Sequence, residues 1–170
     1  MTAYHYKSDI ITDAEASQQS LANKTKVGGV VKELIESIET TASDGVGSTY
    51  RFFRVHSGWR ISSLQLYSDD IGTTTIANFG LYDTTENGGA VVDADFFGSA
   101  VSLKDGAVSG TDITRESAVI DTPDADLELW DQISGLTADP NKWYDVTATL
   151  TGAADAIGTI CLRLRYVDGS

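Results

Sequence analysis

The stretch Thr159-Ile160-Cys161-Leu162-Arg163-Leu164-Arg165-Tyr166-Val167 alternates between two kinds of side chain. One set is apolar, namely Ile160, Leu162, Leu164 and Tyr166, and the other comprises Thr159, Cys161, Arg163 and Arg165. Successive side chains of a β-strand point to opposite faces, so a period of two marks a strand with one face on a core. The segment therefore predicts a half-buried β-strand near the C-terminus.

Similar runs precede this one and are separated by turns rich in Gly, Asn and Asp. They cover residues 30–39, 50–55, 59–67, 73–82, 91–103, 113–120 and 143–150. Two of them predict clear apolar faces: Thr75, Ala77, Phe79 and Leu81 in one, and Tyr144, Val146, Ala148 and Leu150 in the other. The run 30–39 also fits a helical stripe, but Gly28-Gly29 before it and Thr40-Thr41 after it favour a strand.

The run 59–67 changes phase in its middle. Trp59 and Ile61 share one face, whereas Leu64 and Leu66 follow the alternation shifted by one residue. One extra residue in a strand produces such a shift. The pattern predicts a β-bulge at Ser62-Ser63.

One short helix is expected near residues 123–133. Thr122 is a candidate N-cap, Pro123 suits the first helical position, and acidic residues follow in the first turn. The helix would end near Gly135, and its buried side would consist of Leu127, Trp130 and Ile133.

Short antiparallel strands with one covered face predict an all-β sandwich or barrel. About eight strands in two sheets form a jelly roll, which limits exposed sheet edges. We therefore expect one antiparallel two-sheet jelly-roll domain at residues 27–170. Residues 1–26 are polar without a sustained period and are expected to form an N-terminal arm.

Charge and composition exclude several kinds of protein. The chain has 170 residues, with 25 acidic and 12 basic side chains and a net charge of −13. This balance argues against binding nucleic acid or an anionic membrane surface. One cysteine excludes an internal disulfide, and without a signal peptide or a membrane-length apolar run we expect synthesis in a cytoplasm.

The sequence shows no catalytic constellation. His5 lies in the arm, His56 lies in a predicted turn, and Cys161 is expected to be a small buried side chain. The acidic clusters Asp69-Asp70, Asp93-x-Asp95 and Asp121-x-x-Asp124-x-Asp126 lack the spacing of a calcium loop and suit turns or caps. We predict no enzymatic activity, no cofactor and no metal.

Two sets of residues are candidates for binding a partner. Tyr4, Tyr6, Ile10 and Ile11 are apolar anchors in the polar arm, which docks either on a neighbour or on its own domain. Arg163 and Arg165 share one face of the last strand, where they either pair with nearby acids or contact another chain. A carbohydrate groove would instead use Trp143 beside Asn141, or Tyr67 beside Asp69.

The C-terminal third carries a recognisable pattern. Leu129-Trp130-Asp131-Gln132-Ile133-Ser134-Gly135-Leu136 precedes Asp139-Pro140, the run Trp143 to Thr151, and the run Ala156 to Val167. Upstream, Arg60-Ile61-x-x-Leu64-x-Leu66 is followed by Asn78-Phe79-Gly80-Leu81-Tyr82-Asp83. Over residues 50–167 this resembles the small virion proteins encoded beside the major capsid protein of tailed bacteriophages.

The resemblance implies a jelly-roll decoration (cement) protein on the outside of a phage head. Its expected partners are the major capsid protein and other copies of itself, as a homotrimer, and its expected location is the capsid surface after synthesis in the host cytoplasm. It implies no catalytic or cofactor residues. A phage neck or tail component and a carbohydrate-binding β-sandwich module are the alternatives.

Overall fold

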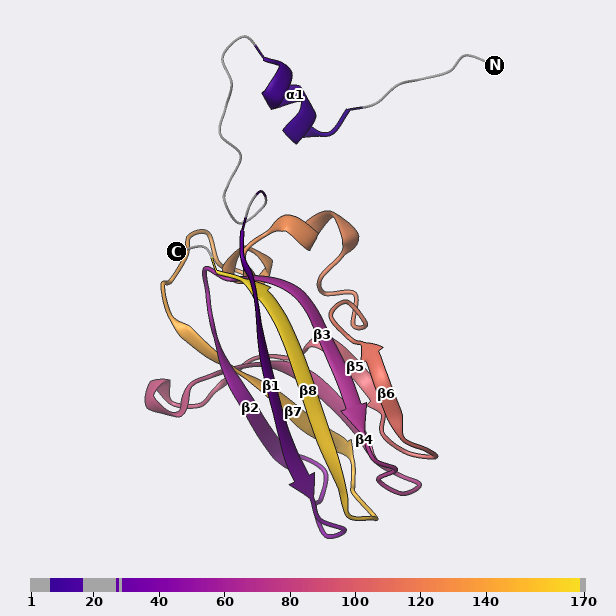
Figure 1. The fold of residues 1–170 in the computed structure, drawn as a ribbon. Helices are drawn as coiled ribbons and strands as arrows, with labels where there is room; N and C mark the ends of the chain where they lie inside the picture. The colour runs from indigo at the N-terminus through magenta and orange to yellow at the C-terminus, as the bar shows by residue number, and fades with distance from the viewer. Residues whose placement is uncertain (1–6, 17–26, 28, 169–170) are drawn as a thin grey trace, which may run out of the picture.

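The computed structural model describes residues 7–16, 27 and 29–168 (Figure 1). Eight strands form two antiparallel four-stranded sheets. The first sheet has the order β1 (Val31–Thr40), β8 (Gly158–Val167), β3 (Arg60–Ser68), β6 (Val108–Asp112). The second has the order β2 (Thr49–His56), β7 (Trp143–Gly152), β4 (Ile76–Asp83), β5 (Val91–Ser102).

The strand order is that of a jelly roll. Successive strands alternate between the two sheets except at β4 and β5, which are neighbours in one sheet. Each sheet thus takes strands from both halves of the chain, as Figure 1 shows for β1 beside β8. This confirms the predicted all-β two-sheet jelly-roll architecture.

The core lies between the sheets and consists of the predicted apolar faces. Ile160, Leu162 and Leu164 of β8 are fully buried, and Ala77, Phe79 and Leu81 of β4 face them from the other sheet. On β7, Tyr144, Val146, Ala148 and Leu150 are buried too. Alternation therefore identified the inner face of these strands correctly.

Two further predictions about strands are also confirmed. The segment at 30–39 is the strand β1, paired with β8 along its whole length. The pairing of β3 with β8 shifts between Ile61 and Ser63, which places the bulge at Ser62. The extra residue lets Ile61 and Leu64 both reach the core.

The strand predicted at residues 113–120 is wrong. The chain forms β6 just upstream, at Val108–Asp112, and then a series of turns in which Ala118 has a positive φ of 58°. Ile113 is buried, but its N–H donates to Leu64 O and Ser117 N–H donates to Phe97 O, which anchors the segment to two different strands. The run is thus a crossover that buries Ile113 and Ile120 and leaves Val119 exposed, rather than a ladder partner.

The single helix predicted near 123–133 is also wrong. Two 3₁₀ helices occupy the region, η2 (Thr122–Asp126) and η3 (Leu129–Gln132), and the N-cap of η2 is Asp121 rather than Thr122. Leu129 N–H donates to Trp59 O and Trp130 N–H to Ser57 O, so bonds to the β2–β3 turn replace helical ones. Leu129 and Ile133 are buried, whereas Leu127 and Trp130 are half-buried.

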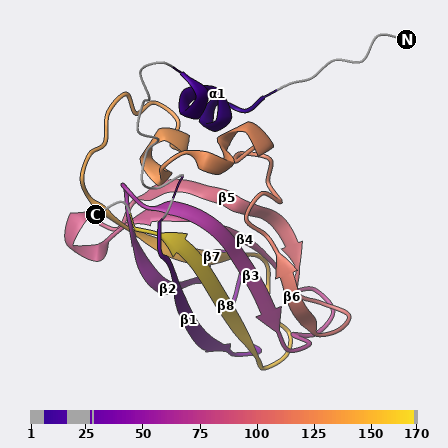
Figure 2. The same cartoon turned by 45° about the horizontal axis from the view of Figure 1, so that its top comes forward.

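Two further helical segments complete the described structure. The arm contains α1 (Asp9–Glu15), and η1 (Thr85–Asn87) lies in the β4–β5 connection, where Gly88 and Gly89 follow it with positive φ angles. Figure 2 shows η2 and η3 at the end of the sandwich where β1 begins and β8 ends. No helix in the described ranges is long and apolar enough to span a membrane.

Candidate interaction surfaces

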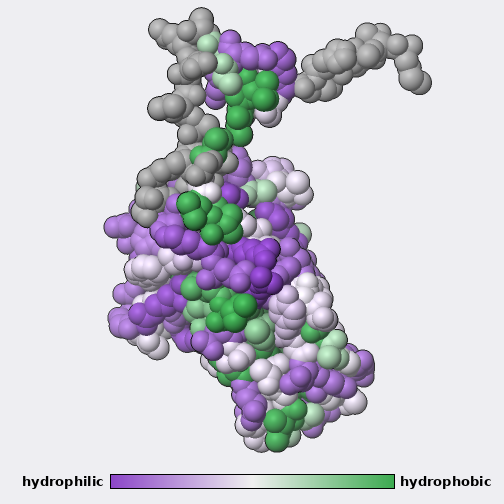
Figure 3. Space-filling view, viewed as in Figure 1, coloured by the Kyte–Doolittle hydropathy of each residue, from purple (hydrophilic) through white to green (hydrophobic). Residues whose placement is uncertain are grey.

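The first candidate surface is the outer face of the first sheet along β1 and β8, here called the β1–β8 face. It carries Glu33, Ile35 and Val31 from β1 and Cys161, Arg163 and Arg165 from β8. In the register, Glu33 lies opposite Arg165 and Ile35 opposite Arg163. Figure 3 looks onto this side and shows green apolar areas between purple hydrophilic ones.

Both predicted arginines are held by one acid. Arg163 Nε lies 2.7 Å and Arg165 Nε lies 2.9 Å from Oε2 of Glu33. The hydrogen bonds from Arg163 and Arg165 lower the pKa of Glu33, and the bond to Glu33 raises the pKa of Arg163. Of the two alternatives that the sequence left open, pairing with a local acid is therefore realised, and contact with another chain stays a prediction.

Apolar side chains stand beside this ionic cluster. Val31 is 57% and Ile35 is 59% exposed, although both belong to a strand. Val30, just before β1, is 72% exposed. Alternation did not identify these residues as a surface, because it does not show which outer side chains remain uncovered. Cys161, expected to be buried, is only partly so, since it lies on this outer face.

The predicted arm residues fall partly within the described structure. In α1, Ser8 is the N-cap and its Oγ accepts from Ile11 N–H. Ile10 and Ile11 are 44% and 47% exposed, so they present apolar surface at this helix. Tyr4 and Tyr6 lie outside the described residues. Binding of a partner by these four residues stays a prediction.

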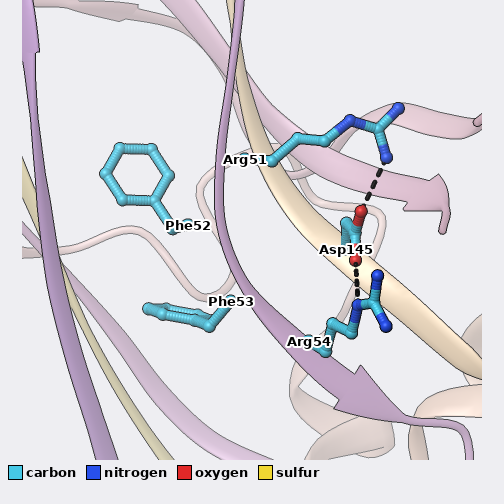
Figure 4. A pocket seen from close by; sticks show the side chains of 5 residues that line it. All are labelled: Arg51, Phe52, Phe53, Arg54 and Asp145. Atoms are coloured by element: carbon cyan, nitrogen blue, oxygen red, sulfur yellow. Dashed lines mark hydrogen bonds and ion pairs between the residues drawn. The ribbon is translucent and has the colours of Figure 1, made fainter. Parts of the chain in front are cut away.

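A second cluster, on the second sheet, was missed in the sequence. Figure 4 shows Arg51 and Arg54 of β2 pointing toward Asp145 of β7, beside a hollow of about 190 Å³. Arg51 Nη1 lies 2.7 Å from Asp145 Oδ2, and Arg54 Nε lies 3.3 Å from Oδ1. The side chain of Asp145 is only 8% exposed. The sequence did contain a signal for this cluster, because Asp145 interrupts an apolar run. Its pairing with Arg51 and Arg54, however, depends on which strands are neighbours in the sheet.

The guanidinium groups of this cluster already have acceptors. Arg51 also donates to Asp83 O and Gly89 O, and Arg54 donates to both carboxylate oxygens of Glu86. The bonds from Arg54 lower the pKa of Glu86 to about 2. The cluster thus fastens the β4–β5 connection to β2 and β7, and its charge is balanced without a bound anion.

Aromatic side chains gather where β1 begins. The rings of Trp59 and Tyr166 stack with centroids 3.9 Å apart, and Trp143 packs edge-on against both Trp59 and His56. Trp143 is 45% exposed. Tyr67, the other aromatic side chain considered for a carbohydrate groove, lies on the first sheet opposite Cys161. The two aromatic side chains thus belong to different sheets, and carbohydrate binding at either one stays a prediction.

The acidic clusters serve local structure. Asp121 and Asp124 form a capping box for η2, Asp69 accepts from Thr159 N–H, and Asp95 N–H donates to Asp93. Partial burial raises the pKa of Asp93. Within the described ranges, no three His, Cys, Asp or Glu side chains are grouped so that they could hold a metal ion.

Comparisons with known proteins found similar folds among solved structures. No family model and no curated protein sequence matches the chain. Among solved structures, a chain of the cyanophage Pam1 capsid asymmetric unit is similar, with a TM-score of 0.52 and 18% identity over 91% of this chain and 94% of that one. A chain of the Ralstonia phage GP4 capsid matches with a TM-score of 0.56 and 18% identity, over 84% and 86% of the two chains.

This chain shares its fold with chains from two phage capsids. At 18% identity the likeness concerns the fold alone. Each match covers most of this chain and most of the capsid chain. Each capsid chain is therefore about as long as this one and is built around the same sandwich.

Proposed function

We propose that this chain is a structural protein of a bacteriophage virion, located on the outer surface of the head. In this role it is a decoration (cement) protein that binds the major capsid protein and further copies of itself. The observation that supports the proposal most is the jelly roll shared with two capsid chains over nearly their whole length. The sequence resemblance at residues 50–167 points to the same role.

The surface of the molecule suits such a role. A net charge of −13 keeps the free protein soluble before assembly. The β1–β8 face carries Val31 and Ile35 beside a balanced ionic cluster, which is the mixture of apolar and charged groups found in protein interfaces. A threefold arrangement of copies, as the resemblance implies, belongs to this proposal.

The arm provides a second contact in the proposal. Its helix α1 exposes Ile10 and Ile11, and the jelly roll has its own core without help from the described arm residues. We therefore propose that residues 1–26 are an attachment arm and residues 27–170 an independently folding domain. An arm that becomes ordered on the shell loses conformational entropy, but repetition over many sites multiplies modest contacts.

The experiment is co-sedimentation of the purified protein with preformed phage heads that lack it. Decoration predicts saturable binding with hundreds of copies per head and a head that resists heating better. A handful of copies would instead indicate a neck or tail component. No binding to heads at any concentration would refute a role on the capsid.

Deleting residues 1–26 tests the arm in the same assay. We expect the truncated protein to keep the thermal unfolding temperature of the full chain and to bind heads at least about tenfold more weakly. The matched control is Ile10→Ser with Ile11→Ser in the full chain, which keeps the length of the arm and should reproduce part of the loss. Equal affinity of the truncated and full-length proteins would refute the arm's role.

A further inference from the structure

The sandwich has four edge strands, and three of them are irregular. The β2 pairing shifts between Arg51 and Phe53, and β5 shifts three times against β4. The β6 strand has only five residues and contains Gly110 at a φ of 69°. Short strands and bulges are the devices by which proteins prevent an edge from pairing with another chain.

The fourth edge, β1, lacks these protections. Its ten residues pair with β8 in unbroken register, and the sequence VKELIESIET contains neither Gly nor Pro. Among the described strands, β8 is the one neighbour of β1, so the main-chain groups on its other side have no ladder partner there. A straight edge of this length is a template for a further strand.

Charges on β1 restrict which strand can be added. Lys32 and Glu36 occupy positions on the core-facing side of β1, yet both side chains are exposed because they lie at the rim of the sandwich. Lys32 Nζ lies 2.8 Å from Asp168 Oδ2, and no described cation pairs with Glu36. Inward-facing charges of this kind repel an apolar strand or one with the wrong charge pattern.

We propose that the partner of β1 is β1 of a second copy, antiparallel and centred on Leu34 about a twofold axis. In this register each Lys32 lies opposite Glu36 of the other copy, and the two Leu34 side chains face each other. Val30, which is 72% exposed, lies opposite the half-buried Ile38 of the other copy. The core-facing side chains from residue 30 to residue 38 thus each meet a side chain of matching character.

Neighbouring registers pair the side chains of the two β1 strands less favourably. Centring the pair on Glu33 or Glu36 sets two glutamates opposite each other, and centring it on Ile35 sets Lys32 opposite Ile38 and Leu34 opposite Glu36. Like charges directly opposite each other destabilise a sheet. On the outer face, the Leu34 register sets Glu33 opposite Ile35 of the other copy, and Glu33 keeps its bonds to Arg163 and Arg165. It also brings the two Ile35 side chains, each 59% exposed, diagonally close to each other.

This contact uses the edge of the first sheet rather than its face, so it is compatible with a threefold contact elsewhere. It requires no capsid and does not depend on the proposed function. In solution the protein should contain an even number of chains, as a dimer or, together with a threefold contact, as a hexamer.

The test is a charge exchange read by light scattering and analytical ultracentrifugation of the full chain. Lys32→Glu and Glu36→Lys each create two like-charge contacts and should weaken the association at least about tenfold. Mixing the two variants in equal amounts should restore it, because a chain with glutamate at both positions then faces a chain with lysine at both. The double exchange K32E/E36K should also associate.

Glu39→Lys is the control. It changes the charge of β1 by the same amount as Glu36→Lys, but position 39 lies opposite Gly29, which has no side chain. It should leave the association unchanged. The proposal is overturned if the wild-type mass is that of one or three chains, or if the mixture of single variants behaves like its separate components. If the β1 edge instead binds a segment of a different protein, the wild-type mass will be that of one or three chains, and the proposal is overturned.

Discussion

Replacing Gly80 by alanine should destabilise the protein strongly. Gly80 lies in β4 where the pairing with β5 jumps from Gly98, opposite Phe79, to Asp93, opposite Leu81. The main chain of β5 therefore passes over Gly80. A Cβ atom there would lie 2.2 Å from Asp93 O and 2.4 Å from the carbonyl carbon of Ala94.

The size of the destabilisation depends on the atoms that the added methyl group would meet. Non-bonded heavy atoms prefer separations of about 3.5–4.0 Å, so the methyl group needs more than about 1 Å of additional space. Extra methyl groups in a packed interior cost about 1–3 kcal/mol, and obstruction by backbone rather than by a side chain places this site at the upper end. A loss of about 3 kcal/mol lowers the unfolding temperature by about 6–12 °C for a chain of this size.

The assay is urea unfolding followed by tryptophan fluorescence, with the free energy of unfolding taken from the midpoint and slope. Gly45→Ala is the matched control, because no atom lies within 4 Å of the added Cβ. It should change the free energy by less than about 1 kcal/mol. If Gly80→Ala is within about 0.5 kcal/mol of the wild type, β5 does not cross over Gly80 and the register described above is wrong.

Two further predictions concern the charged groups. Asp145→Asn should lower the free energy of unfolding by about 1–3 kcal/mol in the same urea assay, because it leaves two partly exposed arginines without their shared anion. The control Asp131→Asn, at an exposed carboxylate, should stay within about 0.5 kcal/mol, and equal effects of the two changes would contradict a structural role of the Asp145 cluster. The second prediction is a loss of stability in acid. Hydrogen bonds from Thr73 lower the pKa of Asp155, and those from Arg54 lower the pKa of Glu86 to about 2. Because the folded-state pKa values lie below the unfolded ones, this stabilisation is complete above about pH 5 and is lost as the pH falls toward about 2. Unfolding temperatures measured from neutral pH down to about pH 2 should show the decline, and Asp155→Asn should make it shallower, whereas identical profiles would contradict the assignment to Asp155.

The candidate surfaces were only partly predictable from the sequence. Arg163 and Arg165 were recognised because they share the polar face of an alternating strand, but the partner of Arg163, Glu33, lies 130 positions earlier in the chain. The Arg51–Asp145 cluster likewise joins residues 94 positions apart. The β1 edge was identified as a strand, whereas its exposure to a partner follows from its place at the end of the sheet order.

The sequence by itself determined the class of fold and the inner face of most strands. A strand's two faces are set by its own backbone geometry, so the alternation at 159–167 and the phase slip at Ser62 were readable locally. Tertiary structure alone decided which strands are neighbours, why residues 113–120 form a crossover and why residues 122–133 split into two 3₁₀ helices. Those outcomes depend on hydrogen bonds to distant carbonyls, such as Leu64 O and Trp59 O, which no local pattern encodes.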